Sequence, residues 1–289
     1  MSESKESHAS ARLTCPVCPR ACRLAPGQAG ACRTRVATDA AVIPKAYGRL
    51  TSLALDPVEK KPLACWHPGS YLLSVGSYGC NFHCPFCQNW QISQVGAYDV
   101  PWQEVSPKEL VALTLREHAR DPHVIGIAHT YNEPLVCWEY VRDVGRLAHE
   151  VGLANVLVSN GCANAQVIDV LAPLIDAANI DLKTFDPKVY QSYGGELATV
   201  KETIRRLGAE PSCHLEVTTL IVPGVNDSEE EVRAIANWLA GVDPKVVLHV
   251  TRFFPRWHMQ DRPPTPVDQV YHLADIAREH LDQVFVGNC

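Results

Sequence analysis

Apolar residues are distributed differently before and after residue 71. From there onward, continuous apolar runs alternate with stretches of helical periodicity. The runs that indicate strands are residues 71–76, 124–129, 154–159, 177–182, 214–222 and 246–251. Continuous apolar strands, each followed by a crossover long enough for a helix, predict a parallel sheet that is buried on both faces. Six such units are too few for a complete eight-fold barrel, so we expect an α/β fold, a partial (β/α)6 barrel of the TIM type, over residues 71–289.

Three sequence signals mark where helices begin. Ser106 is followed by a proline and, three residues later, by Glu109, which is the pattern of a capping box. Ser228 precedes a run of acidic residues that favours the first turn of a helix. Thr265 is followed by a proline in the same way as Ser106, so we expect it to open the last helix.

The chain before residue 71 has a different texture. Residues 1–11 are polar, and we expect a disordered tail there. Residues 12–35 are rich in cysteine, proline and glycine, and short alternating stretches follow them. We therefore expect residues 12–70 to form a small cysteine-rich, metal-binding appendage with short strands.

Composition and charge exclude several classes of protein. Hydrophobic residues make up 46% and charged residues 20% of the 289 residues, as in ordinary globular proteins. The formal net charge of −6 leaves no basic footprint, so we expect no nucleic-acid partner. Residues 1–11 lack the apolar core of a signal peptide, and no later run approaches the roughly 18 apolar residues of a membrane span. We expect a cytoplasmic protein without a membrane partner.

The 12 cysteines are the main chemical signal in the sequence. A disulfide framework belongs to small secreted domains, and neither the length nor the N-terminus of this chain fits one. Most of the cysteines instead form two tight groups, as metal ligands do. The groups are Cys15, Cys18, Cys22 and Cys32, and then Cys80, Cys84 and Cys87. The remaining five are scattered, and we expect most of them to be buried thiols.

The second group directly follows the first predicted strand. Cys80, Cys84 and Cys87 can ligate three irons of a four-iron cluster and leave the fourth iron open, which is the mark of a catalytic metal site. A zinc knuckle that uses these cysteines with His83 is one alternative. A cluster for electron transfer alone is another, but it would have a fourth cysteine nearby.

The first group offers four ligands, which is a closed set. Such a set suits structural zinc and an auxiliary iron–sulfur cluster equally well, and the sequence leaves both open.

Several strings of the sequence resemble one enzyme family. The C-x3-C-x2-C loop, with Phe86 before its last cysteine, is similar to the signature of radical S-adenosylmethionine (SAM) enzymes. Within that superfamily the chain resembles the pyruvate formate-lyase activating-enzyme branch, and most of all the radical SAM enzyme of the AmmeMemoRadiSam system. The other matching strings begin at Cys15 (C-x2-C-x3-C), Asp56 (D-P-V-E-K-K-P-L), Thr130 (T-Y-N-E-P), Asp181 (D-L-K), Glu216 (E-V-T-T-L-I-V-P-G) and Arg252 (R-F-F-P).

The resemblance implies that Cys80, Cys84 and Cys87 hold a 4Fe–4S cluster that cleaves SAM to a 5′-deoxyadenosyl radical. It also implies a set of residues around SAM, each at the end of a predicted strand or in the cysteine loop. They are Phe86, Glu133, Asn160, Asp181 and Lys183. Glu133 matches the acid beside the methionine ammonium. Val158 departs from the acid that relatives often have there, which puts their monovalent-cation site in doubt.

Strand alternation adds an independent argument for some of these residues. Asp181 and Lys183 point to one face, where a buried ammonium needs an anionic partner. A purely structural ion pair is the alternative. Glu216 and Thr218 share a face of the fifth strand, and we expect His249 in the sixth to be a hydrogen-bonded core residue.

These observations predict a radical SAM enzyme that is reduced by ferredoxin or flavodoxin and takes hydrogen from a small molecule or metabolite. A glycyl-radical activase acting on a partner protein is the alternative, and a non-catalytic metal-binding protein is a third. The sequence leaves open the substrate, the oligomeric state, and whether Cys65, Cys162 or Cys289 donates a hydrogen atom.

Overall fold

The apolar runs after residue 71 form one curved sheet in the computed structural model, which describes residues 12–289. The predicted tail, residues 1–11, lies outside the described residues. Seven strands are parallel, and β6 joins one edge in the antiparallel direction. In spatial order the strands are β14 (Val284–Gly287), β13 (Val247–Arg252), β12 (His214–Ile221), β11 (Ala177–Asp181), β10 (Ala154–Ser159), β9 (Val124–His129), β7 (Tyr71–Gly76) and β6 (Ser52–Pro57).

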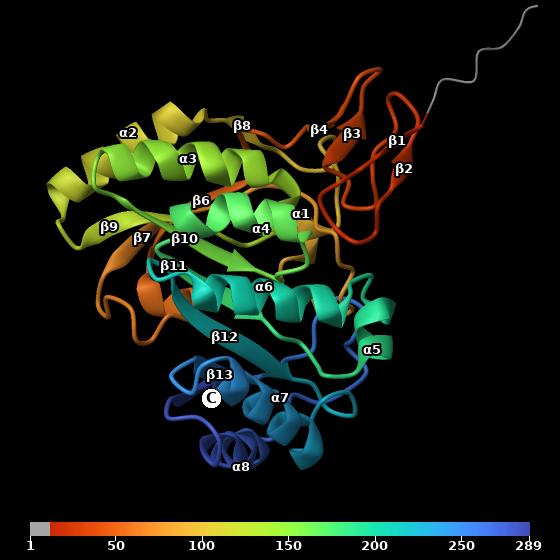
Figure 1. The fold of residues 1–289 in the computed structure, drawn as a ribbon, viewed down its shortest axis with the longest axis vertical. Coiled ribbons are helices and arrows are strands. Elements are labelled where there is room, and N and C mark those ends of the chain that lie inside the picture. Colours follow the sequence, from red (N-terminus) through yellow and green to blue (C-terminus); the bar gives the residue numbers. More distant parts are fainter. Residues whose placement is uncertain (1–11) are drawn as a thin grey trace, which may run out of the picture.

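Helices follow most of the strands and cover the outer face of the sheet (Figure 1). The α-helices are α1 (Trp90–Ser93), α2 (Pro107–Arg120), α3 (Trp138–Glu150), α4 (Ala165–Leu171), α5 (Pro187–Ser192), α6 (Leu197–Ala209), α7 (Glu229–Val242) and α8 (Val267–Arg278). Short 3-10 helices are η1 (Val58–Lys60), η2 (Pro134–Cys137) and η3 (Ala172–Leu174). This alternation confirms the α/β class and the partial barrel, because the sheet has two unpaired edges, β14 and β6.

The predicted strands agree with the observed ones to within one residue at each end. Two strands of the sheet lie outside that prediction. β14 adds a seventh parallel strand beside β13, and β6 comes from the 12–70 stretch yet pairs with β7 along its whole length. β14 has only four residues, and β6 carries exposed apolar residues, so neither has the continuous buried pattern of the central strands.

The helix starts agree with the predicted caps at two positions and differ at one. Ser106 accepts from the N–H of Glu109 within a capping box, and Ser228 caps α7. Thr265 was predicted to open the last helix as its cap, and this prediction is wrong. Its hydroxyl donates to the carbonyl oxygen of Ile221 at 2.6 Å, and Thr265 is fully buried. Because the Thr265 hydroxyl has its hydrogen-bond partner on β12, it does not bond to the first turn of α8, which begins without a side-chain cap.

The two faces of the sheet are filled by different parts of the chain. On the outer face, Leu73 and Val75 of β7 pack with residues of α2 and α3. On the inner face, Val58 and Leu63, from the segment between β6 and β7, pack against Leu72 and other apolar residues of the central strands. That segment therefore fills the inner face and leaves the carboxyl ends of the strands for chemistry.

The N-terminal stretch forms three short antiparallel pairs beside the main sheet. They are β1 (Leu13–Thr14) with β2 (Arg23–Leu24), β3 (Arg35–Ala37) with β4 (Val42–Pro44), and β5 (Arg49–Leu50) with β8 (Gln103–Glu104). Figure 1 shows β1 to β4 as a separate group at the upper right, beyond the main sheet. A buried ion pair anchors the group, because the Arg35 guanidinium lies 2.9 Å from the carboxylate of Glu139 in α3.

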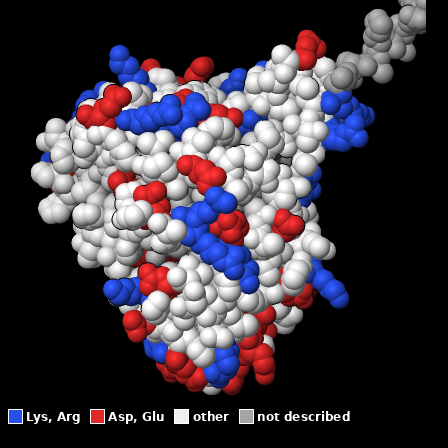
Figure 2. All heavy atoms as spheres, in the orientation of Figure 1, with Lys and Arg blue, Asp and Glu red and all other residues white. Residues whose placement is uncertain are grey.

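Charged side chains of both signs are interspersed on the face of the molecule seen in Figure 2. Part of this mixture on α6 consists of ion pairs, such as that between Arg206 and Glu202 at 2.8 Å. Among the helices of residues 12–289, none is both long enough and apolar enough to cross a bilayer.

Candidate active site

The three cysteines predicted to bind a cluster lie on one loop directly after β7. Cys84 is buried, and Cys80 and Cys87 are partly exposed. Asn132, which follows β9, holds this loop by donating from Nδ2 to the carbonyl oxygen of Gly79 at 3.0 Å. The loop is thereby fixed at the carboxyl edge of the sheet, where enzymes with parallel barrels have their active sites.

The surroundings of the sulfur atoms suit thiolate ligands. The backbone N–H of Phe82 donates to Sγ of Cys80 at 3.3 Å, and Sγ of Cys87 lies 3.2 Å from Oγ of Ser93. Burial raises the pKa of the Cys84 thiol to about 12, so without a metal this thiol is neutral. Metal binding displaces such a proton. Three thiols on one loop, two of them beside polar hydrogens, form a donor set that fits an iron–sulfur cluster.

Glu133, predicted to bind the ammonium group of SAM, lies at the end of β9 and is 2% exposed. Its carboxylate accepts from the N–H of Leu135 at 2.9 Å, from the hydroxyl of Ser159 at 2.7 Å and from the N–H of Asn160 at 2.8 Å. Burial raises the pKa of Glu133 to about 7, although these three donors favour the carboxylate. Glu133 thus ties the end of β9 to the end of β10, and its contact with SAM stays a prediction.

Asn160 reaches the cysteine loop from the end of β10. Its Nδ2 lies 2.8 Å from Oδ1 of Asn81 and 3.7 Å from Sγ of Cys80. Asn81 in turn donates to the carbonyl oxygen of Cys162 at 2.9 Å. Asn81 was not among the residues predicted for the site. An amide inside the cysteine spacing, facing a predicted strand end, is the signal that could have identified it.

Asp181 and Lys183 form the predicted ion pair, with Nζ 3.0 Å from Oδ2. The side chain of Lys183 is 14% exposed and that of Asp181 is 37% exposed. Burial alone would lower the pKa of Lys183, but the negative charge of Asp181 and the hydrogen bond to its carboxylate raise that pKa above its ordinary value. A permanent positive charge therefore lies beside the innermost cysteine of the loop.

Phe86 is buried and forms an apolar wall next to this lysine. Its ring packs edge-on against Tyr193, with centroids 5.5 Å apart, and against Phe253, with centroids 6.5 Å apart. Nζ of Lys183 lies 5.9 Å from the centroid of the Phe86 ring. The structure therefore brings Phe86 and Lys183 together.

Glu216 and His249 lie away from the cysteine loop, on the inner face. The carboxylate of Glu216 is fully buried and accepts from the backbone N–H groups of Ala64 and Cys65 at 2.9 and 2.8 Å. It also lies 2.8 Å from Nε2 of His214 and 2.5 Å from Nε2 of His249. His249 is a hydrogen-bonded core residue, as expected, and Glu216 holds the 58–70 segment inside the sheet.

Two of the family-like strings meet in a buried cluster that the site prediction did not include. Asp56 accepts from Lys61 Nζ at 2.7 Å and from the hydroxyl of Tyr131 at 2.5 Å. Lys61 is only 2% exposed, and Tyr131 has a left-handed backbone with φ of 70°. The position of Tyr131 between the cysteine loop and β6 comes from the sheet order, which the strings by themselves do not show.

The first four cysteines lie around the β1–β2 hairpin and the turn that precedes β3. The N–H of Cys15 donates to the carbonyl oxygen of Cys22 at 2.9 Å, and the hydroxyl of Thr34 lies 3.1 Å from Sγ of Cys32. Within residues 12–289, no three His, Cys, Asp or Glu side chains are gathered tightly enough to coordinate one metal ion. That observation applies to both cysteine groups alike, and both remain predictions as metal ligands.

The five scattered cysteines are less uniform than expected. Cys137 and Cys162 are buried, Cys213 is half-buried, and Cys65 and Cys289 are exposed. The expectation that most would be buried therefore holds for Cys137 and Cys162 only. Cys65 is held at the surface by a contact of 2.6 Å between Sγ and Oε1 of Gln283.

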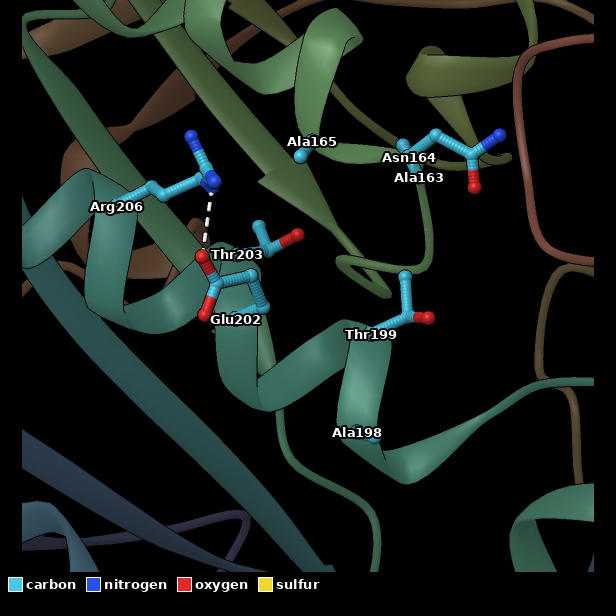
Figure 3. A pocket seen from close by; sticks show the side chains of 8 residues that line it. All are labelled: Ala163, Asn164, Ala165, Ala198, Thr199, Glu202, Thr203 and Arg206. Carbon is cyan, nitrogen blue, oxygen red and sulfur yellow. Dashed lines mark hydrogen bonds and ion pairs between the residues drawn. The ribbon is translucent and has the colours of Figure 1, made fainter.

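A cavity of about 230 Å³ lies on the helical side of the sheet, between the start of α4 and α6 (Figure 3). Its lining residues are Ala163, Asn164, Ala165, Ala198, Thr199, Glu202, Thr203 and Arg206. The cysteine loop and the residues predicted to bind SAM do not contribute to this lining. The cavity is therefore separate from the candidate site.

Comparison with known proteins agrees with this geometry. Residues 74–239 match the family model described as the Radical SAM superfamily. The uncharacterized protein MJ0808 of Methanocaldococcus jannaschii is 35% identical over 96% of this chain and 81% of its own length. The indoleacetate decarboxylase activating enzyme of Tractidigestivibacter scatoligenes is 25% identical over 54% of this chain, which spans about half of that enzyme (53%).

One solved structure shows the likeness of the fold. A radical SAM methyltransferase from Sphaerobacter thermophilus superposes with a TM-score of 0.58 at 18% identity, over 76% of this chain and 66% of that one. The resemblance to the AmmeMemoRadiSam enzyme stays a prediction, because none of these proteins bears that name.

Proposed function

The chain belongs to the Radical SAM superfamily, and we propose that Cys80, Cys84 and Cys87 are the residues that bind its 4Fe–4S cluster. The cofactors of this family are that cluster and SAM. When bound and reduced, they supply a 5′-deoxyadenosyl radical that takes a hydrogen atom from the substrate. The observation that supports the assignment best is the cysteine loop at the carboxyl edge of the sheet, with Nδ2 of Asn160 3.7 Å from Sγ of Cys80 and Nζ of Lys183 over the ring of Phe86 in the same loop.

The protein residues around this loop would bind and orient SAM and shield the metal site from water. Lys183 keeps a positive charge beside Cys84, which favours the addition of an electron to the metal site. Phe86 is buried against other aromatic rings and excludes water from the same space. Asn160 offers amide groups for SAM, and Glu133 holds Asn160 in place through its backbone N–H.

We propose a small molecule or metabolite as the substrate. The N-terminal group covers the cysteine loop: Arg20 donates to the carbonyl oxygen of Asn81 at 3.4 Å, and Cys32 packs against Gly79. A loop of a partner protein would have to enter through this covered region, whereas a small molecule needs less space.

A glycyl-radical activase is the second candidate, because an activating enzyme is among the relatives. That relative is named for a decarboxylase that it activates, and the shared region spans about half of it. In this case the substrate would be a backbone glycine of a partner enzyme.

We further propose that a ferredoxin or flavodoxin supplies the electron and that the protein works in a reducing cytoplasm. The two cysteine groups support this, because thiols at metal-ligand spacing must stay reduced to bind a metal.

The function is tested by anaerobic reconstitution with iron and sulfide, reduction by dithionite with SAM, and measurement of 5′-deoxyadenosine. Cys84→Ala is expected to abolish the product, and Cys213→Ala, which alters a thiol far from the loop, is the matched control. A wild-type protein that binds zinc and forms no 5′-deoxyadenosine would show that the chain is a non-catalytic metal-binding protein. A glycyl-radical EPR doublet on a partner protein would favour the activase over the small-molecule enzyme.

A further inference from the structure

The cavity between α4 and α6 has largely apolar walls. Its volume is about 230 Å³, and the methyl groups of Ala163, Ala165 and Ala198 contribute to its lining (Figure 3). An apolar protein cavity of roughly 150 Å³ can hold a benzene molecule. The space between α4 and α6 is therefore large enough for a compact molecule that is somewhat larger than benzene.

One buried polar group at this cavity lacks a partner. Thr203 of α6 is 1% exposed, and its hydroxyl forms no hydrogen bond with any of the described residues. In Figure 3 this hydroxyl points toward the space between Ala165 and Thr199. A buried hydroxyl without a partner destabilises the folded state, so a ligand that offers it a hydrogen bond gains free energy from that contact.

The charged side chains at the cavity are already paired with one another. Nε of Arg206 lies 2.8 Å from Oε1 of Glu202, and the same guanidinium contacts the carboxylate of Asp169. The hydroxyl of Thr199 donates to the carboxylate of Glu196. A charged ligand would have to replace one of these pairs and also lose its own hydration. The lining therefore favours an uncharged ligand.

The loop that follows β10 forms one wall of the cavity, and its other side contacts the cysteine loop. A Cβ built on Gly161 would lie 3.6 Å from Cγ2 of Thr203, so this loop packs on α6 next to the unpartnered hydroxyl. On the other side, the carbonyl oxygen of Cys162 accepts from Nδ2 of Asn81 at 2.9 Å. Nδ2 of Asn160 lies 2.8 Å from Oδ1 of the same Asn81. A molecule in the cavity would thus rest on the back of the loop that reaches the candidate site.

We propose that this cavity binds a compact, uncharged alcohol or phenol. The hydroxyl of the ligand bonds to the hydroxyl of Thr203, and its apolar body packs on the three alanines. Bound there, the ligand stabilises the loop of residues 160–164, which carries Asn160 to the cysteine loop. The site is separate from the one proposed for SAM, and its ligand binds whether or not the chain cleaves SAM.

Thermal unfolding tests whether the Thr203 hydroxyl is unpartnered. Valine has nearly the same shape as threonine, so Thr203→Val should leave Tm unchanged or raise it. Thr114→Val is the matched control, because Thr114 is fully buried in α2 and its hydroxyl donates to the carbonyl oxygen of Leu110 at 2.9 Å. This control should lower Tm by about 2–3 °C. An equal fall in both variants would show that Thr203 already has a partner within the protein, which would overturn the proposal.

Binding is tested with phenol and toluene, which are similar in size and differ in the hydroxyl, by ligand-observed NMR on the full reconstituted chain. Phenol is expected to bind saturably, and Thr203→Val should weaken its affinity about 5-fold while changing that of toluene less than ~2-fold. Ala198→Phe, which fills the cavity from an exposed position on α6, should abolish the binding of both probes. Phenol that does not saturate, that binds Ala198→Phe as well as the wild type, or that Thr203→Val affects no more than toluene would overturn the proposal.

Hydrogen exchange tests the effect on the loop. The N–H of Cys162 donates to Oδ1 of Asn160 at 2.9 Å, and that of Asn164 donates to the carbonyl oxygen of Val17 at 2.8 Å. Saturating phenol should slow the exchange of residues 160–164 at least ~3-fold in the wild-type protein and leave it unchanged in Ala198→Phe. Unchanged exchange in the wild-type protein would overturn the stabilisation of the loop. A reconstituted chain that binds phenol in this way but forms no 5′-deoxyadenosine would support this site and contradict the proposed function.

Discussion

The substitution Glu216→Gln tests how the inner face of the sheet is held together. Glu216 is fully buried on β12, and its carboxylate receives the backbone N–H groups of Ala64 and Cys65 and contacts two histidines. Glutamine has the same shape, but one of its two terminal atoms is a donor. That donor must face at least one backbone N–H, which is then left without an acceptor.

The size of the effect follows from the charge of the group. Burial alone would raise the pKa of Glu216, but hydrogen bonds from His214 and His249 and from two backbone N–H groups lower it to about 2. Against the ordinary value of 4.5, this corresponds to about 3 kcal/mol of stability from the ionised carboxylate. This stability is fully present above pH ~4.5 and is lost as the pH falls toward 2. Over that range the unfolded chain binds the proton, whereas the folded protein keeps the carboxylate ionised, so the protonated unfolded state becomes relatively more stable. At pH 7.5 the whole difference is expected, and an unpaired buried N–H costs a similar 1–3 kcal/mol.

The assay is an anaerobic urea titration of the reconstituted protein at pH 7.5, followed by fluorescence. We expect Glu216→Gln to lower the free energy of unfolding by about 3 kcal/mol with an unchanged m value, and Tm by roughly 5–10 °C. Glu104→Gln, at an exposed position on β8, is the matched control and should change stability by less than about 0.5 kcal/mol. A double-mutant cycle with His249→Gln should show a coupling of at least ~1 kcal/mol.

A cost of less than about 1 kcal/mol for Glu216→Gln would mean that the carboxylate is not an ionised acceptor of these bonds. A different failure is a stable variant that no longer cleaves SAM. That result would place Glu216 in the chemistry of the site and not in the packing of the 58–70 segment.

Three further substitutions test the site itself. Gly79→Ala would place a Cβ 2.3 Å from the carbonyl oxygen of Cys32 at a φ of 80°, so we expect this variant to bind less than half of the wild-type iron. Gly27→Ala is the control, because Gly27 has a φ of 81° but no atom lies within 4 Å of its Cβ position, and this variant should retain its iron. Colorimetric iron analysis compares the two variants. Lys183→Met removes a positive charge beside the cysteine loop, so we expect a lower midpoint potential in an EPR titration and SAM cleavage at least ~10-fold slower, with Lys183→Arg close to wild type. Asn160→Ala should weaken SAM binding about 5- to 10-fold in calorimetry without loss of iron, and an unchanged affinity would remove Asn160 from the SAM site.

The strands and the cysteine loop could be predicted from the sequence because their signals are local. Continuous apolar runs identify buried parallel strands within a few residues, and alternation places Asp181 and Lys183 on one face. Three cysteines separated by three and two residues lie close together in space in any fold. Local patterns failed for β6 and β14, whose place at the edges of the sheet depends on which neighbour they pair with.

The contacts of the cysteine loop and of the inner face were decided by the tertiary structure, because they join residues far apart in the chain. The carboxylate of Glu133 could equally have been a solvated loop acid, and only the neighbouring position of β10 gives it Ser159 and Asn160 as donors. The bridge from Arg20 to Asn81 spans 61 residues, and the bonds from Ala64 and Cys65 to Glu216 span more than 150. No periodicity within a segment encodes such pairs. They form because the sheet order brings the ends of separate strands to one edge, where buried polar groups must find partners.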